Sequence, residues 1–244
     1  MTACPPGTYN TLNSQSYCTN CQSGYYCPLS AMAEYFDYIC TAGHYCPIGT
    51  AIPVQCPIGK FSPHSIIGNG DINSCTNCTA GYYCASEGMM NVTGKCDAGY
   101  YCTSNAYTRT QQYTSEIGGP CPVGSYCLQG SGAPKPCPIG SYMPSTLNTG
   151  FHFMLGINYL CYPCPSGKSC NQTGLSHANG GINKGYWSIA GAKTATPICS
   201  DFSCSELFGL CPIGSYCPGN TVKPLPCSSG YYQDEIGQFN CKVL

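Results

Sequence analysis

Cysteine is the residue type that could do the most chemistry in this sequence, because 24 of its 244 residues are cysteines. A cysteine can form a disulfide, hold a metal ion or act as a nucleophile. The last two roles need a free thiolate, whereas an even number of cysteines can pair completely in an oxidising medium. The count permits twelve disulfides with no thiol left over.

Cys-x2-Cys pairs are the closest match to a metal site. Zinc ribbons place two such pairs about 15–20 residues apart, but the pairs here are much farther apart, and each continues into the repeat described below. Calcium sites need dense oxygen ligands, and Asp71-Ile72-Asn73 is a single acidic step. We therefore expect no metal and no cofactor. The Cys-x2-Cys pairs are Cys18/Cys21, Cys75/Cys78 and Cys161/Cys164.

Residues for catalysis are poorly supplied. The four histidines lie in unrelated contexts, and His44 occupies a repeat position where other copies have Tyr or Ser. The acidic pair Asp234-Glu235 is adjacent in the chain and lies in a variable loop. A nucleophilic cysteine needs a base beside a free thiolate. We predict that the protein is not an enzyme.

The charge composition excludes nucleic-acid binding. Only 8% of the residues are charged, with 9 Lys and Arg against 10 Asp and Glu, whereas about 25% is usual. A nucleic-acid binder needs clustered Lys and Arg, and the sequence has no such cluster. A nearly neutral surface favours either a coat of sugar or close neighbours, since soluble monomers keep their net charge away from zero.

A repeat positions the cysteines. The element Cys-x5-Cys recurs with Gly-x-Tyr inside most copies, and the same glycine–aromatic step follows the single cysteines Cys4, Cys56, Cys137 and Cys227. The seven copies are Cys21/Cys27, Cys40/Cys46, Cys78/Cys84, Cys96/Cys102, Cys121/Cys127, Cys164/Cys170 and Cys211/Cys217.

These elements combine into a longer unit, which divides the chain. Complete copies span residues 40–84 and 121–170, and partial copies span 1–39 and 211–244. Two spacers interrupt the array. Residues 85–120 form a spacer with an extra cysteine pair, and residues 171–210 form a spacer that contains the one tryptophan.

The composition between the cysteines predicts the fold class. Glycine allows the positive φ of tight turns, proline after cysteine fixes φ, and an aromatic ring beside each bridge supplies apolar area that a thin module lacks. Gly and Pro together make up 50 residues, and helical periodicity is absent. We expect a small disulfide-rich repeat array of short β-hairpins and loops, with little or no helix, elongated in shape.

Several strings resemble the ephrin-receptor-like cysteine-rich repeat, which is akin to EGF-like and tumour-necrosis-factor-receptor-like modules and recurs in surface proteins of protists and algae. They include Cys4-Pro5-Pro6-Gly7-Thr8-Tyr9 and the segments 121–127 and 211–219. By analogy with the receptor modules, the resemblance implies that each long gap is closed on itself. The implied disulfides are Cys4–Cys18, Cys56–Cys75, Cys137–Cys161 and Cys227–Cys241; the other connectivities stay open.

Three Asn-x-Ser/Thr motifs predict N-linked glycans. Asn91 and Asn171 lie in or beside the spacers and are the better candidates. Asn77 is the weaker one because Cys78 beside it is expected to be bridged early.

Tyr186 and Trp187 form a possible interface. A single tryptophan in a thin fold is either a local cap or an interface anchor, and we favour the cap.

The chain's ends fall in mid-unit, so we expect either a longer parent polypeptide or ends that meet those of neighbours. No apolar run is long enough for a membrane span, and no signal peptide is visible. We therefore expect a processed product or part of a longer precursor.

These observations predict an extracellular or cell-surface glycoprotein with a structural role. It would be a building block of a filament, an appendage or a cell-surface coat, through repeat-to-repeat packing with neighbouring copies of the same chain. The alternative is a receptor or adhesion ectodomain that binds a protein ligand, and a weaker third option is a lectin-like coat protein that meets sugars through its tyrosines.

Overall fold

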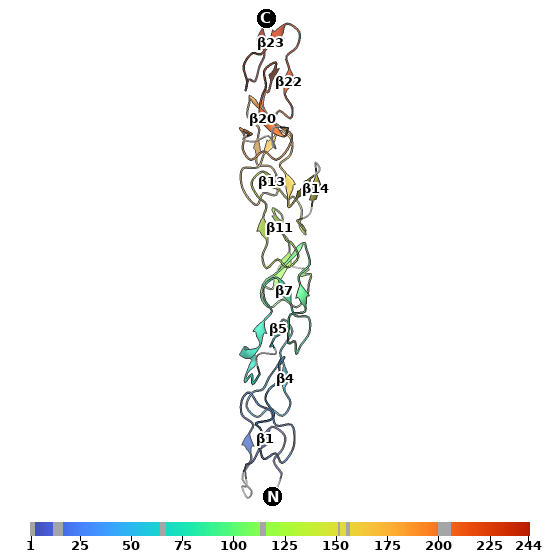
Figure 1. The fold of residues 1–244 in the computed structure, drawn as a ribbon, viewed down its shortest axis with the longest axis vertical. Coiled ribbons are helices and arrows are strands. Elements are labelled where there is room, and N and C mark those ends of the chain that lie inside the picture. The colour runs from blue at the N-terminus through green and yellow to red at the C-terminus, as the bar shows by residue number, and fades with distance from the viewer. Residues whose placement is uncertain are drawn as a thin grey trace. The chain divides into compact units, whose positions relative to one another are not determined.

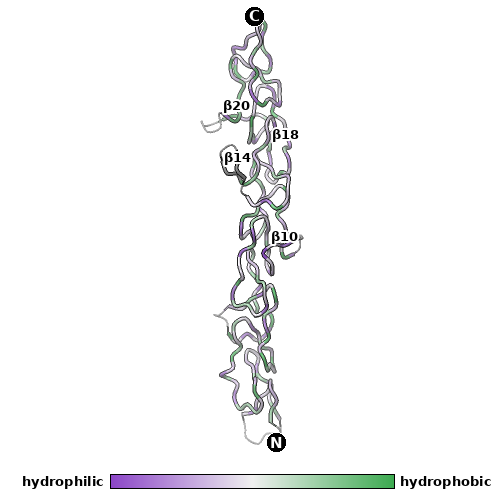
Figure 2. Tube along the Cα trace, turned by 90° about the vertical axis from the view of Figure 1, so that its right-hand side faces the viewer, coloured by the Kyte–Doolittle hydropathy of each residue, from purple (hydrophilic) through white to green (hydrophobic). Residues whose placement is uncertain are grey.

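The fold consists of short hairpins and turns. The structure, a computed structural model, describes residues 3–11, 17–63, 67–112, 116–150, 152–154, 157–199 and 206–244. Within them, the 3-10 turn η1 (Ile72–Ser74) is the single helical element, and no helix has the length and hydrophobicity of a membrane span. Hydrophobic and hydrophilic residues are interspersed along the described part of the trace (Figure 2). The prediction of a disulfide-rich array of β-hairpins is confirmed.

The strands pair two by two (Figure 1). The pairs are β1 (Thr8–Tyr9) with β2 (Thr19–Asn20), β3 (His44–Tyr45) with β4 (Val54–Gln55), β5 (Lys60–Phe61) with β6 (Thr76–Asn77), β7 (Tyr82–Tyr83) with β8 (Gly94–Lys95), β9 (Tyr100–Cys102) with β10 (Gly118–Pro120), β11 (Ser125–Tyr126) with β12 (Lys135–Pro136), β13 (Ser141–Tyr142) with β16 (Tyr162–Pro163), β14 (His152–Met154) with β15 (Ile157–Tyr159), β17 (Lys168–Ser169) with β18 (Gly180–Gly181), β19 (Tyr186–Ser188) with β20 (Phe208–Leu210), β21 (Ser215–Tyr216) with β22 (Leu225–Pro226), and β23 (Tyr231–Tyr232) with β24 (Lys242–Val243).

The chain forms two compact units. Unit 1 comprises Met1–Asp97, Tyr101–Gly119 and Gly130–Ala133, and unit 2 comprises Ala98–Tyr100, Pro120–Gln129 and Pro134–Leu244.

Both units are built from a seven-residue segment, which we call a step. A step has glycine at its fourth position, and its fifth and sixth residues pair with the two residues that precede the next step or, in the last step, with Lys242–Val243. Such a short hairpin is marginal by itself in water, so each step needs support from its neighbours. The steps begin at Cys4, Cys21, Cys40, Cys56, Cys78, Cys96, Cys121, Cys137, Cys164, Ile182, Cys211 and Cys227.

Four backbone hydrogen bonds join a step to the one that follows. The glycine donates to the last residue of the next step and accepts from its first residue. Two further bonds reach the loop that follows the next step. The last residue of the step donates its backbone N–H to that loop, and the first residue accepts from it through its carbonyl oxygen. In the step at 21–27, the bonds join Gly24 N–H to Cys46 O (2.9 Å), Cys40 N–H to Gly24 O (2.9 Å), Cys27 N–H to Thr50 O (2.9 Å) and Gly49 N–H to Cys21 O (2.7 Å).

Unit 2 repeats the same pattern. Because these bonds satisfy backbone groups that would otherwise be buried without partners, they give the array its regularity. In the step at 121–127, they join Gly124 N–H to Met143 O (2.8 Å), Cys137 N–H to Gly124 O (2.8 Å), Cys127 N–H to Asn148 O (2.9 Å) and Leu147 N–H to Cys121 O (2.9 Å).

The loop residue that donates to the first residue of a step always has positive φ. Glycine fills most of these positions, as at Gly49 with φ 78°. The four described non-glycine residues with positive φ all occupy this position, which shows that the bond network holds the backbone there despite the cost to an L-residue. They are Ala31 (φ 59°), Asn105 (φ 71°), Leu147 (φ 62°) and Asn220 (φ 51°).

Disulfides come in two kinds. A step that ends in cysteine is closed by its own bridge, as in Cys40–Cys46 with Cα atoms 5.9 Å apart. Where the last residue is Asn10, Ser62, Met143 or Gln233, the first cysteine instead bridges to a cysteine 14–24 residues later. The described residues contain no free cysteine.

Sulfur and aromatic rings replace an ordinary core. Most of the fully buried side chains are cysteines. Around Cys21 and Cys27, Tyr35 is buried, and its ring centroid lies 4.7 Å from that of Tyr9 and 5.0 Å from that of Tyr25. Burial by these neighbours raises the pKa of Tyr35.

One step has no cysteine at all. In residues 182–188, Ile182 and Ser188 stand where other steps carry a cysteine pair, and both are buried. The bonds nevertheless recur, because Gly167 N–H donates to Ser188 O (2.8 Å) and Ile182 N–H donates to Gly167 O (3.2 Å). This step lies inside the segment 171–210 that the sequence analysis treats as a spacer.

A matched pair of glycine substitutions tests the packing between steps. Gly124 and Gly214 occupy the same position in nearly identical steps, with φ of 73° and 78°. A Cβ on Gly124 would overlap the carbonyl oxygen of Gly174, whereas a Cβ on Gly214 would meet nothing within 4 Å. We expect Gly214→Ala to cost about 1–2 kcal/mol from backbone strain and Gly124→Ala to cost clearly more. Calorimetry of the oxidised proteins measures both, and equal losses would contradict this packing.

The cysteine-free step offers a second test. We expect Ile182→Cys combined with Ser188→Cys to form a new disulfide, since loop closure over seven residues stabilises by about 2 kcal/mol. Ser188 Oγ is also buried without a hydrogen-bond partner, so little polar bonding is lost. Non-reducing mass spectrometry detects the loss of two thiol hydrogens. Ser188→Cys alone is the control, and two free thiols in the double variant would show that this segment is not a true step.

Candidate functional site

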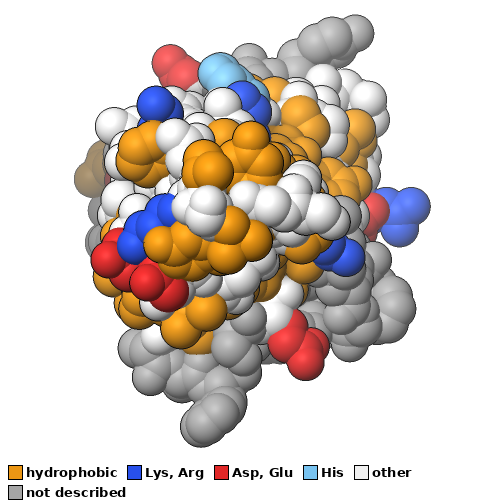
Figure 3. Space-filling model, turned by 90° about the horizontal axis from the view of Figure 1, so that it is seen from above, with side chains coloured by type: hydrophobic (Ala, Val, Ile, Leu, Met, Phe, Trp, Pro, Cys, Tyr) orange, Lys and Arg blue, Asp and Glu red, His pale blue; other side chains and the backbone are white. Residues whose placement is uncertain are grey.

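Exposed aliphatic side chains are the most distinctive surface feature of the described residues. In the view from above, Figure 3 shows hydrophobic side chains at the surface, with Lys, Arg, Asp and Glu side chains among and around them. Single exposed hydrophobic residues are ordinary, but gathered ones mark interaction sites. Among the described residues, ten isoleucines are exposed: Ile39, Ile48, Ile52, Ile58, Ile67, Ile72, Ile139, Ile198, Ile213 and Ile236.

In unit 1, several of these side chains line a groove of about 570 Å³. Ile52, Val54 and Ile72 contribute its aliphatic surface, with exposed fractions of 78%, 41% and 44%. Pro53 lies between the first two, and Glu87 provides an acidic group in the lining. We call these five residues the aliphatic groove.

Local structure explains why these residues meet. Val54 lies in β4 opposite Tyr45 of β3, and Pro53 fixes φ just before the strand. Ile72 begins η1, whose start is capped by Asp71 accepting from Asn73 N–H at 2.7 Å. The Cys56–Cys75 bridge then ties the end of this turn to the residue after β4.

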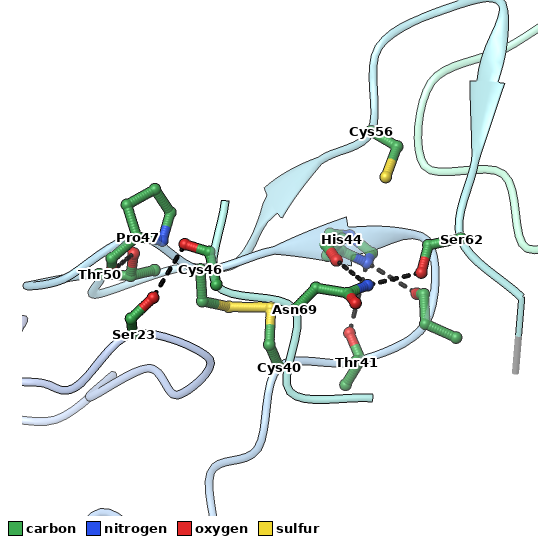
Figure 4. Close-up of a disulfide and its surroundings, with 12 residues drawn as sticks. Ser23, Cys40, Thr41, His44, Cys46, Pro47, Thr50, Cys56, Ser62 and Asn69 are labelled. Atoms are coloured by element: carbon green, nitrogen blue, oxygen red, sulfur yellow. Dashed lines mark hydrogen bonds between the residues drawn. A yellow bond between two sulfur atoms is a disulfide. The ribbon is translucent and has the colours of Figure 1, made fainter. Parts of the chain in front are cut away.

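The buried residue Asn69 holds β3 in place through hydrogen bonds (Figure 4). Asn69 Nδ2 donates to His44 O at 3.0 Å and to Ser62 Oγ at 2.6 Å, and Asn69 O accepts from Cys46 N–H at 2.8 Å. His44 Nδ1 lies 3.0 Å from Ala42 O. His44 is therefore part of the structural hairpin, and it also lines the groove.

Two further loops correspond to the one that carries Ile52 and Val54. Each has nine residues between two cysteines, with proline at the same position, at residues 47–55, 128–136 and 218–226. The position of Val54 is taken by Lys135 and Leu225, each opposite a tyrosine in its hairpin. The loop at 47–55 therefore presents two aliphatic residues, Ile52 and Val54. Each of the other loops has a lysine at one of these two positions, because Lys135 corresponds to Val54 and Lys223 corresponds to Ile52.

The two units carry opposite net charges. Unit 1 contains six Asp and Glu and three Lys and Arg, a net charge of −3, whereas unit 2 contains four and six, a net charge of +2. The ion pairs between described side chains are Arg109–Asp97, Lys242–Asp234 and Lys242–Glu235. Glu87, Lys135 and Lys223 are exposed and belong to none of these pairs.

A second, smaller groove of about 330 Å³ lies in unit 2 and is lined by Tyr216, Tyr231, Ser228 and Asn240. Near it, Lys242 Nζ contacts Asp234 Oδ1 at 2.6 Å in the last hairpin. The hydrogen bond from Lys242 lowers the pKa of Asp234, and the same bond raises the pKa of Lys242. Both side chains are well exposed, so the pair contributes little to stability.

The structure joins the cysteines that the resemblance implies as pairs: Cys4–Cys18, Cys56–Cys75, Cys137–Cys161 and Cys227–Cys241. Among the residues that the structure describes, no three or more His, Cys, Asp or Glu side chains gather as a metal site would require.

Trp187 is held within its own hairpin. Its Nε1 donates to Leu210 O at 3.2 Å, and it lies opposite Gly209 in the β19–β20 pair. A Cβ on Gly209 would lie 3.7 Å from Nε1, an ordinary van der Waals distance, so the ring lies against the backbone of Gly209. Tyr186 beside it is half-buried. This arrangement supports the hypothesis of a local cap.

The three predicted glycosylation residues, Asn77, Asn91 and Asn171, are all exposed. Asn77 lies in β6 directly before the bridged Cys78. The Oδ1 of Asn171 accepts from Asn179 Nδ2 at 2.6 Å. In the Asn91 motif, Thr93 Oγ1 accepts from Ala85 N–H at 2.8 Å.

Sequence reasoning missed the aliphatic groove, although a signal for it exists. An alignment of the three nine-residue loops would have shown Ile52 and Val54 where the other loops carry Lys223 and Lys135. Ile72 and Glu87 could not be found in this way, because they come from different turns.

Comparisons with known proteins add no name to this site. No protein-family model matches the sequence, and no curated protein matches it. The repeated disulfide-closed hairpins identify the chain as a cysteine-rich repeat protein.

The glycosylation motifs yield a direct prediction. In material from the native source, we expect peptide-N-glycosidase to lower the mass, because exposed asparagines accommodate a glycan without loss of packing. In a recombinant protein from a glycosylating host, Asn91→Gln and Asn171→Gln should each remove one glycan. Asn77→Gln is the comparison variant, for which we expect no change. An untreated mass equal to that of the bare polypeptide would contradict the prediction.

Proposed function

We propose that this chain is an extracellular structural protein, a building block of a filament, an appendage or a cell-surface coat. In this role it associates with neighbouring copies of itself through its repeat surfaces and performs no catalysis. The dense disulfides support a location outside the reducing cytosol.

The aliphatic groove is the observation that carries this proposal. Ile52, with 78% of its surface exposed, stands beside Val54 and Ile72 on a chain with only 8% charged residues. A soluble protein that stays monomeric usually has a well-charged surface and few exposed aliphatic side chains side by side. Association with a neighbour would instead remove the patch from water, at about 25 cal/mol per Å² of apolar area.

The resemblance to ephrin-receptor-like repeats agrees with this role, as such modules serve as stalks, spacers and adhesive coats. It equally fits the alternative of a receptor or adhesion ectodomain. The interactions of Trp187 within its own hairpin weigh only against Trp187 as the anchor of a protein-binding site, since exposed rings such as Phe36 and Tyr231 remain available for that role.

Electron microscopy and sedimentation test the proposal. We expect native material to contain regular polymers, and we expect the purified, fully oxidised chain to sediment as larger species as its concentration rises. The same measurement on reduced and alkylated chain is the control, because the surfaces need the folded hairpins. Monodisperse single chains at every concentration would overturn the proposal and favour the receptor alternative.

A further inference from the structure

We propose that the aliphatic groove of one chain binds the loop at residues 218–226 of a second copy, with Glu87 of the first paired to Lys223 of the second. The inference rests on the proposed function and specifies the surfaces that would carry it.

The aliphatic groove has apolar side chains exposed to water and a carboxylate outside the described ion pairs. Ile52, Val54 and Ile72 expose aliphatic surface in unit 1, and the carboxylate of Glu87 in the same lining takes part in none of the ion pairs of the described residues. A partner that matches it must offer apolar side chains together with one positive charge.

The loop at 218–226 offers that combination. Val222 and Leu225 are 43% and 41% exposed, and Lys223 between them is exposed as well. Leu225 is held in β22 opposite Tyr216, and Pro224 and Pro226 flank it. Because prolines restrict the free loop, little conformational entropy is lost on binding.

Long-range charge favours the same pairing. The groove belongs to the unit with net charge −3, and the loop belongs to the unit with net charge +2. Unit 1 of one copy therefore attracts unit 2 of another, whereas like units repel. The corresponding loop at 128–136 has Gly132 and Lys135 where Val222 and Leu225 stand, so it lacks both apolar side chains, and Ala133 replaces Lys223.

The pairing joins two different surfaces of the same chain. A heterologous contact of this kind leaves one groove and one loop available on every dimer, so that it generates open polymers unless its rotation closes a ring. This property connects the inferred contact to the filament or coat proposed above.

Apolar substitutions provide the first arm of the test, measured by sedimentation velocity on the intact oxidised chain. We expect Ile52→Ser to weaken association at least about tenfold, as for a central interface residue. Leu29→Ser is the matched control, since Leu29 is also in unit 1, is 57% exposed and lies outside the groove. We expect no change in that variant. Equal effects of the two substitutions would overturn the inference.

Charge reversal provides the second arm. We expect Glu87→Lys and Lys223→Glu each to weaken association about fivefold, and we expect the double variant to recover the original affinity. Lys193→Glu, at another exposed lysine of unit 2, controls for net charge. A double variant as weak as the single ones would contradict the pairing.

The outcomes separate the two proposals. If the unmodified chain associates but none of these variants alters it, the assembly role stands and the groove-to-loop contact is wrong. If the unmodified chain never associates, the assembly role itself fails. Non-reducing peptide mapping confirms that each variant retains its disulfides.

Discussion

The backbone bonds between successive steps are the interaction on which the rest of this structure depends. Each step is a hairpin too short to persist by itself, and its glycine both donates to and accepts from the following step. The packing of later loops requires a bare Cα at most of these glycines, because a Cβ on Gly124, for example, would overlap the carbonyl oxygen of Gly174. Glycine at the fourth position is therefore a packing requirement as much as a turn requirement.

Disulfides have a secondary role in this arrangement. The step at 182–188 has the same backbone bonds with Ile182 and Ser188 in place of cysteines. A bridge restricts the unfolded chain, so it stabilises a geometry that the backbone bonds already define. The length of each bridge depends on the residue that ends the step. Where that residue is Ser62 or Met143, the first cysteine of the step is bridged to a cysteine beyond the step.

Such an architecture leaves the side chains between the cysteines without a core to fill. In an ordinary domain, Ile52 and Val54 would be buried against a helix or a second sheet. Here the buried volume is taken up by sulfur and by small clusters such as the one around Tyr35, and the aliphatic residues remain on the surface. In the part of the chain that the structure describes, the lack of a large interior and the exposure of aliphatic side chains thus have one physical cause, which links the fold to the proposed assembly.

The hairpin array, the scarcity of helix among the described residues and the position of nearly every step follow from the sequence alone, because cysteine spacing and glycine–aromatic pairs are local signals. The sequence could not reveal the step at 182–188, whose identity depends on bonds to Gly167 rather than on residue type. It also could not reveal that Ala31 and Leu147 adopt positive φ, because neighbouring steps impose that conformation against local preference. Only the tertiary structure brought Ile72 and Glu87 to Ile52, since residues from three separate turns meet through long-range pairing that spacing along the chain does not encode.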